Sequence, residues 1–172
     1  MIHEYYKELQ NNQNIRENLS LLRSECKDPQ ARETLLSLVG DGALLTGLLE
    51  SDEPKVRKNA ALLLGSLGLL QTAGSLFHAY EREQTLFVRS AYLTALSGME
   101  VSPYLEALKE HRDALLAREI PENEKKHVNE ELRELERIIT AAEGITRHTF
   151  VGFTEPQAAL SRFNRNLKAL KK

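Results

Sequence analysis

The stretch Val56-Arg57-Lys58-Asn59-Ala60-Ala61-Leu62-Leu63-Leu64-Gly65-Ser66-Leu67-Gly68 decides the fold of this chain, because it is repeated. A looser copy, Val88-Arg89-Ser90-Ala91-Tyr92-Leu93-Thr94-Ala95-Leu96-Ser97-Gly98, follows 32 residues later. A third stretch, Pro29 to Gly40, overlays Pro54 to Gly65 with a shift of 25 residues. Repetition at such a period predicts stacked helical pairs, in which each unit buries its apolar face against its neighbours.

The copies have the features of helices with one buried face. Pro29 and Pro54 each follow an acidic residue, and proline suits the first turn of a helix, where its missing N–H is not needed. Apolar residues recur at the spacing of one helix face. The predicted buried positions are Val56, Ala60, Leu63, Leu64 and Leu67 in one copy, and Val88, Tyr92, Ala95, Leu96 and Met99 in the next.

Further helices complete the predicted hairpins. The last of them is long and charged, and its apolar residues alternate steps of four and three, which gives one narrow stripe of Val128, Leu132, Leu135, Ile139 and Ala142. The additional helices are predicted over residues 4–10, in the segment before Asp28, over residues 43–50 and 72–82, from Ser102-Pro103 onward, and from Pro121 to about Glu143.

The pattern Asp52-x-Pro54-x-Val56-Arg57-x-x-Ala60-Ala61-x-x-Leu64-Gly65-x-Leu67-Gly68 resembles the second helix of a HEAT repeat. The resemblance extends over about residues 13–143, and it implies a short right-handed α-solenoid of about four HEAT-like hairpins that serves as a binding surface. It also implies that the arginines of the repeats are structural and occupy equivalent places. The structural repeat positions would be Asp52, Pro54, Arg32, Arg57 and Arg89.

Composition predicts a folded chain with a distinct C-terminal part. The chain has 172 residues, of which 41% are hydrophobic and 28% are charged, and this is ordinary for a folded domain. The net charge of −2 gives no general attraction to nucleic acid or to acidic membranes. From Arg147 onward, however, basic residues outnumber acids. The charge shift predicts a boundary near Gly144, between a helical repeat domain (1–144) and a basic extension (145–172).

The extension is predicted to be an extended segment followed by an amphipathic helix. His148 to Phe153 is β-prone, and Thr154-Glu155-Pro156-Gln157 has the pattern of a helix cap. The extension resembles the junction that precedes a class I methyltransferase domain in some bacterial RNA-modifying enzymes, so we expect the chain to be the front part of a longer protein. The candidate nucleic-acid contacts are Arg162, Arg165, Lys168 and Lys172.

No catalytic, cofactor-binding or metal-binding residues are predicted. Glu124-x-x-His127 has the spacing of a carboxylate di-metal site, and His127 with Glu131 also has a ligand spacing, but such sites need a second Glu-x-x-His, which the chain lacks. A solvated helix face is the favoured interpretation. Cys26 has no partner histidine in register, so a packing role is favoured over a nucleophilic one.

The expected location is the cytoplasm. Cys26 is the only cysteine, which excludes an internal disulfide and fits a reducing compartment. The N-terminus lacks the apolar core of a signal peptide, and no apolar run is long enough for a membrane span. No membrane partner is therefore predicted.

The function favoured by the sequence is a non-catalytic module that binds a protein or a neighbouring domain on its concave face. Helix phase indicates which residues point away from the buried set. Leu62 and Phe87 would be the apolar anchors, because exposed apolar groups in a polar frame often mark contacts. The candidate partner-binding residues are Lys55, Lys58, Asn59, Leu62, Phe87, Ser90 and Thr94, with Ala91 predicted to face the same way.

Two alternatives remain open at this stage. The first is the substrate-guiding or nucleic-acid-binding part of an RNA-modifying enzyme such as a methyltransferase, supported by the basic extension and its phenylalanines. The second is a DNA glycosylase, because one group of these enzymes is built from HEAT-like repeats. The chain has no tryptophan and no visible combination of basic groove, aromatic residues and acid, so the second alternative is disfavoured.

Overall fold

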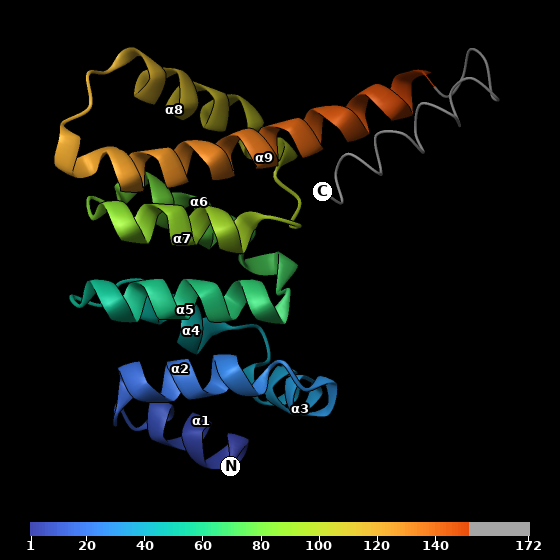
Figure 1. The fold of residues 1–172 in the computed structure, drawn as a ribbon. Helices are drawn as coiled ribbons and strands as arrows, with labels where there is room; N and C mark the ends of the chain where they lie inside the picture. The colour runs from blue at the N-terminus through green and yellow to red at the C-terminus, as the bar shows by residue number, and fades with distance from the viewer. Residues whose placement is uncertain (152–172) are drawn as a thin grey trace.

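The computed structural model describes residues 1–151, with the side chains of residues 1–144. All regular structure in this range is helical, as predicted (Figure 1). The α-helices are α1 (Ile2–Gln10), α2 (Ile15–Glu25), α3 (Pro29–Val39), α4 (Ala43–Leu48), α5 (Pro54–Leu67), α6 (Ala73–Arg82), α7 (Leu86–Leu96), α8 (Leu105–Ala117) and α9 (Lys125–Val151). Short 3-10 turns lie at Leu70–Thr72, Ser102–Tyr104 and Glu122–Glu124.

The predicted helix starts at Pro29 and Pro54 are confirmed. Each proline is the first residue of its helix, and the Asp28 carboxylate accepts a hydrogen bond of 3.0 Å from the backbone N–H of Ala31. Such a bond satisfies one of the backbone donors that a helix start leaves free. Helix α5 ends at Leu67 and is followed by Gly68, whose φ of 65° is the left-handed conformation that glycine adopts without strain.

Four helices form a layer in the order α2, α5, α7, α9 (Figure 1). Neighbours in this layer run parallel. The start of α5 meets the start of α7 at Lys58 and Phe87, and its end meets the end of α7 at Gly65 and Ala95. The starts of α2 and α5 line one hollow and their ends another, whereas α7 meets α9 first at Arg89 and Glu131 and then, at its end, beside Ile138. Helices α1, α4, α6 and α8 pack on α2, α5, α7 and α9, respectively, each just before its partner in the chain. The described chain is therefore a row of helical pairs.

The predicted buried positions of the two main copies form the centre of the core. All ten of them are buried, from Val56 on α5 to Met99 after α7. Gly65 has a special place in this packing, because a Cβ atom there would lie 2.7 Å from the Cα of Ala95. The absence of a side chain at Gly65 thus lets α5 and α7 approach each other closely.

The structure corrects the expectation that Arg32 occupies the same place as Arg57 and Arg89. Helix α3 packs mainly on α1 and lies outside the layer, so the first member of the layer is α2. The guanidinium of Arg32 donates to the carbonyl oxygens of Ser66 (3.1 Å) and Leu67 (2.9 Å) at the end of α5. Helix ends leave such carbonyls without partners, which explains why a cation lies there.

A different stretch takes the place predicted for the Pro29 copy. In α2, Ile15-Arg16-Glu17-Asn18 has the same residue types as Val56-Arg57-Lys58-Asn59, except that glutamate replaces lysine. The hollow between these helix starts is lined by residues of both stretches, among them Arg16 and Val56. The extra helix α3 between α2 and α4 explains why the repeat spacing is irregular at this point.

The start of the predicted C-terminal extension is helical and not extended. Helix α9 continues through Gly144 to Val151, so the extended segment predicted from His148 is wrong for residues 148–151. The rest of the predicted extension, residues 152–172, lies outside the described residues. None of the helices within residues 1–151 is both long enough and apolar enough to cross a bilayer.

Candidate functional site

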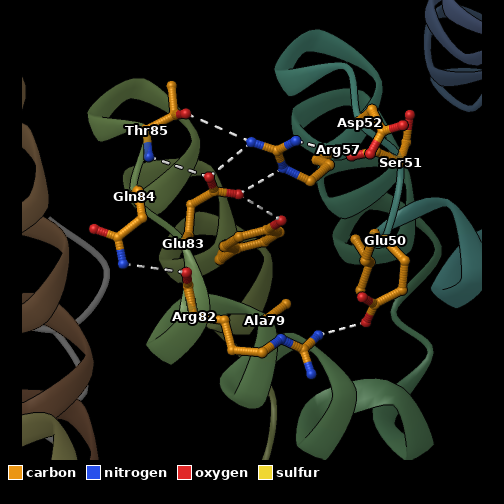
Figure 2. A pocket seen from close by; sticks show the side chains of 11 residues that line it. Glu50, Ser51, Asp52, Arg57, Ala79, Arg82, Glu83, Gln84 and Thr85 are labelled. Carbon is orange, nitrogen blue, oxygen red and sulfur yellow. Dashed lines mark hydrogen bonds and ion pairs between the residues drawn. The ribbon is translucent and has the colours of Figure 1, made fainter.

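Arg57 lies in a buried cluster at the edge of the layer, where the loops before α5 and α7 meet (Figure 2). Its guanidinium donates to both carboxylate oxygens of Glu83 at 2.8 Å, and Nη1 donates to the carbonyl of Ser51 at 2.8 Å. Glu83 also accepts from the Tyr92 hydroxyl (3.0 Å) and from the backbone N–H of Thr85 (3.1 Å). Arg57 thus joins α5 to the α6–α7 turn.

These contacts change the acidity of Glu83. Burial would raise the pKa of its carboxyl group, but the hydrogen bonds from Arg57, the Thr85 N–H and Tyr92 hold the pKa below the ordinary value of 4.5. A carboxylate with a lowered pKa stabilises the fold above its unfolded-state pKa, and this stabilisation is lost as the pH falls through the folded-state value. The cluster should therefore weaken in acid.

A Glu83→Gln variant tests this expectation. We expect the variant to be less stable than the parent at pH 7, because Arg57 loses its anion, and the two stabilities to converge as the pH falls below 4.5 and through the lowered pKa of Glu83. Urea unfolding at a series of pH values measures this difference. Glu53→Gln, which changes an exposed acid, serves as the control and should follow the parent throughout. A stability gap for Glu83→Gln that stays constant in acid would contradict the assignment.

Arg89 makes the same kind of contacts one unit later. Its Nη1 donates to the carbonyl of Glu83 at 2.8 Å, and its Nε and Nη2 lie 2.9 and 2.8 Å from Glu131 Oε1. The Tyr80 hydroxyl donates to the same oxygen at 2.6 Å, and the Arg89 guanidinium lies 4.4 Å from the centre of the Tyr80 ring. Arg57 and Arg89 each bind the carbonyl six residues earlier and a carboxylate from the following unit.

The two tyrosines act as hydrogen-bond donors in these clusters. Burial is the largest cause that raises the pKa of both Tyr80 and Tyr92, and the negative charge of the neighbouring glutamate adds to it. Both hydroxyls therefore keep their protons at neutral pH and can donate to the carboxylates. The hydroxyls thus help to keep the two carboxylates ionised and fixed in position.

A hollow of about 330 Å³ lies over the Arg57 cluster. Four of its charged side chains form two ion pairs: Arg57 with Glu83, and Arg82 with Glu50 (Figure 2). Asp52, to which the family resemblance assigns a structural role, is exposed at the rim, and Glu83 is the acid that holds Arg57. The chemistry of this hollow is that of a structural ion pair.

The candidate partner-binding residues lie on the outer side of α5 and α7. Lys58 and Phe87 contact each other across the two helices, with the ammonium 5.8 Å from the ring centre. Ala91, predicted to face outward with them, is buried. Of the seven, Lys55 and Thr94 are exposed and the other five are half-buried: Lys58, Asn59, Leu62, Phe87 and Ser90.

His127, Glu131 and Cys26, which were considered as metal ligands or as a nucleophile, do not lie in the surroundings that those roles require. Glu131 is fully buried and bound to Arg89 and Tyr80, and His127 Nδ1 lies 3.7 Å from Glu130. Within the described range, no three histidine, cysteine or acidic side chains come together as a metal site would require. Burial raises the pKa of the Cys26 thiol, which makes its reactive thiolate form scarcer.

Sequence reasoning identified the arginines but missed the residues that hold them: Tyr80, Glu83, Tyr92 and Glu131. One signal was present. Glu131 lies three residues after Val128 and four before Leu135, so it shares their helix face. An acid in an apolar stripe must find a buried cation, and Arg89 was the available partner.

The comparisons with known proteins do not add to this picture. No family model matches the chain, and comparisons with curated proteins and with solved structures find no similar protein. The candidate nucleic-acid contacts of the extension, Arg162, Arg165, Lys168 and Lys172, lie outside the described residues. The function must therefore be inferred from the residues and geometry given above.

Proposed function

We propose that this chain is a short right-handed α-solenoid of about four HEAT-like hairpins that acts in the cytoplasm as a non-catalytic interaction module. Support for the solenoid comes from the parallel layer α2, α5, α7, α9 and from the matching contacts of Arg57 and Arg89 in successive units. These buried ion pairs hold the units together at one edge of the layer. The outer side of α5 and α7, which carries Leu62 and Phe87, takes no part in them and is the proposed binding surface.

The observation that carries the binding proposal is the placement of Leu62 and Phe87. Both side chains are half-buried and lie on adjacent parallel helices, in a frame of lysine, amide and hydroxyl groups. Apolar anchors within a polar frame are typical of protein-binding surfaces. A protein segment placed along α5 and α7 would cover both anchors and leave the buried ion pairs undisturbed.

A double substitution, Leu62→Ala with Phe87→Ala, tests the proposal. Peptides that bind the parent chain are first selected from a random-peptide phage library, and their affinities for parent and variant are compared by fluorescence anisotropy. We expect the double variant to bind at least about tenfold more weakly, because central apolar anchors carry much of the binding energy. Phe87 also packs partly on the core, so a small loss of stability is expected as well.

The matched control is Leu116→Ala on α8. Leu116 is 64% exposed and belongs to a helix outside the layer, so its removal should leave both affinity and stability unchanged. Circular dichroism must show that the double variant is still folded at the assay temperature. Selected peptides that bind the folded double variant as tightly as the parent would refute the proposed binding face.

A further inference from the structure

The exposed side of α2 carries cations without acidic partners. Arg16 and Arg23 are seven residues apart, which places them on one side of α2, and Lys27 follows two residues after the helix ends. All three are exposed, and within the described residues none of them forms an ion pair. Charged groups in this state are available to a ligand.

The neighbouring helix α5 adds two more such cations. Lys55 is exposed, and within the part of the chain that the structure describes, the ammonium of Lys58 contacts the Phe87 ring but no carboxylate. Helix α8 shows the opposite arrangement, because Lys109 pairs with Glu143 and Arg112 with Glu136. Not every surface cation is therefore unpaired. Within the described residues, unpaired cations also occur elsewhere, such as Lys7 on α1 and Arg133 on α9, but the α2–α5 side carries five of them: Arg16, Arg23, Lys27, Lys55 and Lys58.

These cations lie along one seam, which is the line of contact between α2 and α5. Helices α2 and α5 are adjacent, and the hollow at their C-terminal ends, about 380 Å³, is lined by Arg23, Ser24, Cys26, Lys27 and Ser66. Arg32 joins this end through its bond to the Ser66 carbonyl. The hollow at the N-terminal ends contains Arg16. Basic groups thus gather at the C-terminal end of the seam, and Lys58 on α5 lies beside the apolar anchor Phe87.

We propose that the partner is an acidic protein segment that lies across α2, α5 and α7. Its carboxylates would meet Arg23 and Lys27 at one end and Lys58 at the other, and its apolar side chains would cover Leu62 and Phe87. This inference rests on the proposed binding function and adds the charge of the partner to it. Complementary charge speeds association and excludes wrongly charged partners.

The same surface suits a protein segment better than a nucleic acid. Glu17 and Glu53 line the N-terminal hollow together with Arg16, and they would repel the unbroken row of phosphates in a nucleic acid strand. A peptide, by contrast, can place its carboxylates only where the cations lie.

Three labelled probes test the proposal on the full chain. The first is a peptide of glutamates with interspersed leucine and phenylalanine, the second is its lysine counterpart, and the third is a single-stranded oligouridine. We expect the acidic peptide alone to bind, and Arg23→Glu with Lys58→Glu to weaken its binding at least about tenfold. The control, Lys7→Glu with Arg133→Glu, changes the charge equally and should bind like the parent. Its two cations lie on α1 and α9, are exposed, and form no ion pair with any described residue.

Each other result has a distinct meaning. Equal binding of both peptides, lost in the Leu62→Ala/Phe87→Ala variant, would overturn the acidic partner and leave the binding face standing. Tighter binding of the oligouridine than of the acidic peptide would overturn the proposal and indicate that the partner is a nucleic acid. An equal loss of affinity in the control variant would contradict the proposed site, because it would show that the net charge of the chain, and not the position of the cations, governs binding. If none of the three probes binds and the selected library peptides are not enriched in acidic residues, the acidic partner is overturned, but the proposed binding face still stands.

Discussion

Replacing Glu131 with alanine is expected to lower the free energy of unfolding by about 3 to 5 kcal/mol. Glu131 is fully buried, and its carboxylate is the anion that pairs with Arg89, whose side chain is only 16% exposed. The substitution leaves a largely buried guanidinium without a counter-ion, and it removes the acceptor of the Tyr80 hydroxyl. Urea unfolding followed by circular dichroism measures the loss.

Two further variants show whether burial is the cause. Glu50→Ala removes the exposed partner of Arg82 on the same edge of the layer, and exposed pairs contribute little, so we expect a change within about 0.5 kcal/mol. Arg89→Met with Glu131→Leu removes both charges and should recover most of the loss. A loss below about 1 kcal/mol for Glu131→Ala would show that Arg89 is not held by this acid.

Alanine at Gly65 is expected to destabilise the chain by about 2 kcal/mol, although alanine is the better helix former. The new Cβ would lie 2.7 Å from the Cα of Ala95. Because the obstacle is backbone, no side-chain rotation relieves it, and α5 must move away from α7. Packing between the two helices that form the centre of the core would then be lost.

The same substitution at Gly47 provides the matched control. Gly47 lies in α4, and a Cβ atom there meets nothing within 4 Å. Gly47→Ala should therefore stabilise the chain by about 0.5 to 1 kcal/mol through helix propensity and reduced freedom of the unfolded state. Thermal unfolding of both variants measures the difference. Changes of the same sign at both positions would show that helix propensity, and not packing, governs Gly65.

Much of the fold was predictable because helix formation leaves local marks on the sequence. Proline at a helix start and apolar residues at helical spacing are short-range features, and they located α5 and α7 together with their buried faces. The prediction that the third copy, Pro29 to Gly40, lies beside α5 in the layer was wrong for a related reason. The start of α3 carries the same local marks, but only tertiary packing decides that α2 takes the place beside α5.

The buried ion pairs were only half predictable. The repeat pattern pointed to Arg57 and Arg89, because both fall in the same register of the copies. Their partners come from different elements: Glu83 follows α6, whereas Glu131 lies within α9. No periodic signal connects those two acids, so their roles depend on distances that only the folded chain establishes.

Glu83 belongs to both clusters, and this has a consequence for how the protein loses its structure. Its carboxylate binds Arg57 and its backbone carbonyl binds Arg89, so one residue connects α5 with the unit that ends in α9. Arrays whose units meet only through apolar contacts can fray from one end. Here the terminal pair cannot detach without disturbing the residue that anchors α5. Hydrogen exchange should therefore show the amides of α5, α7 and α9 opening together, as one cooperative block.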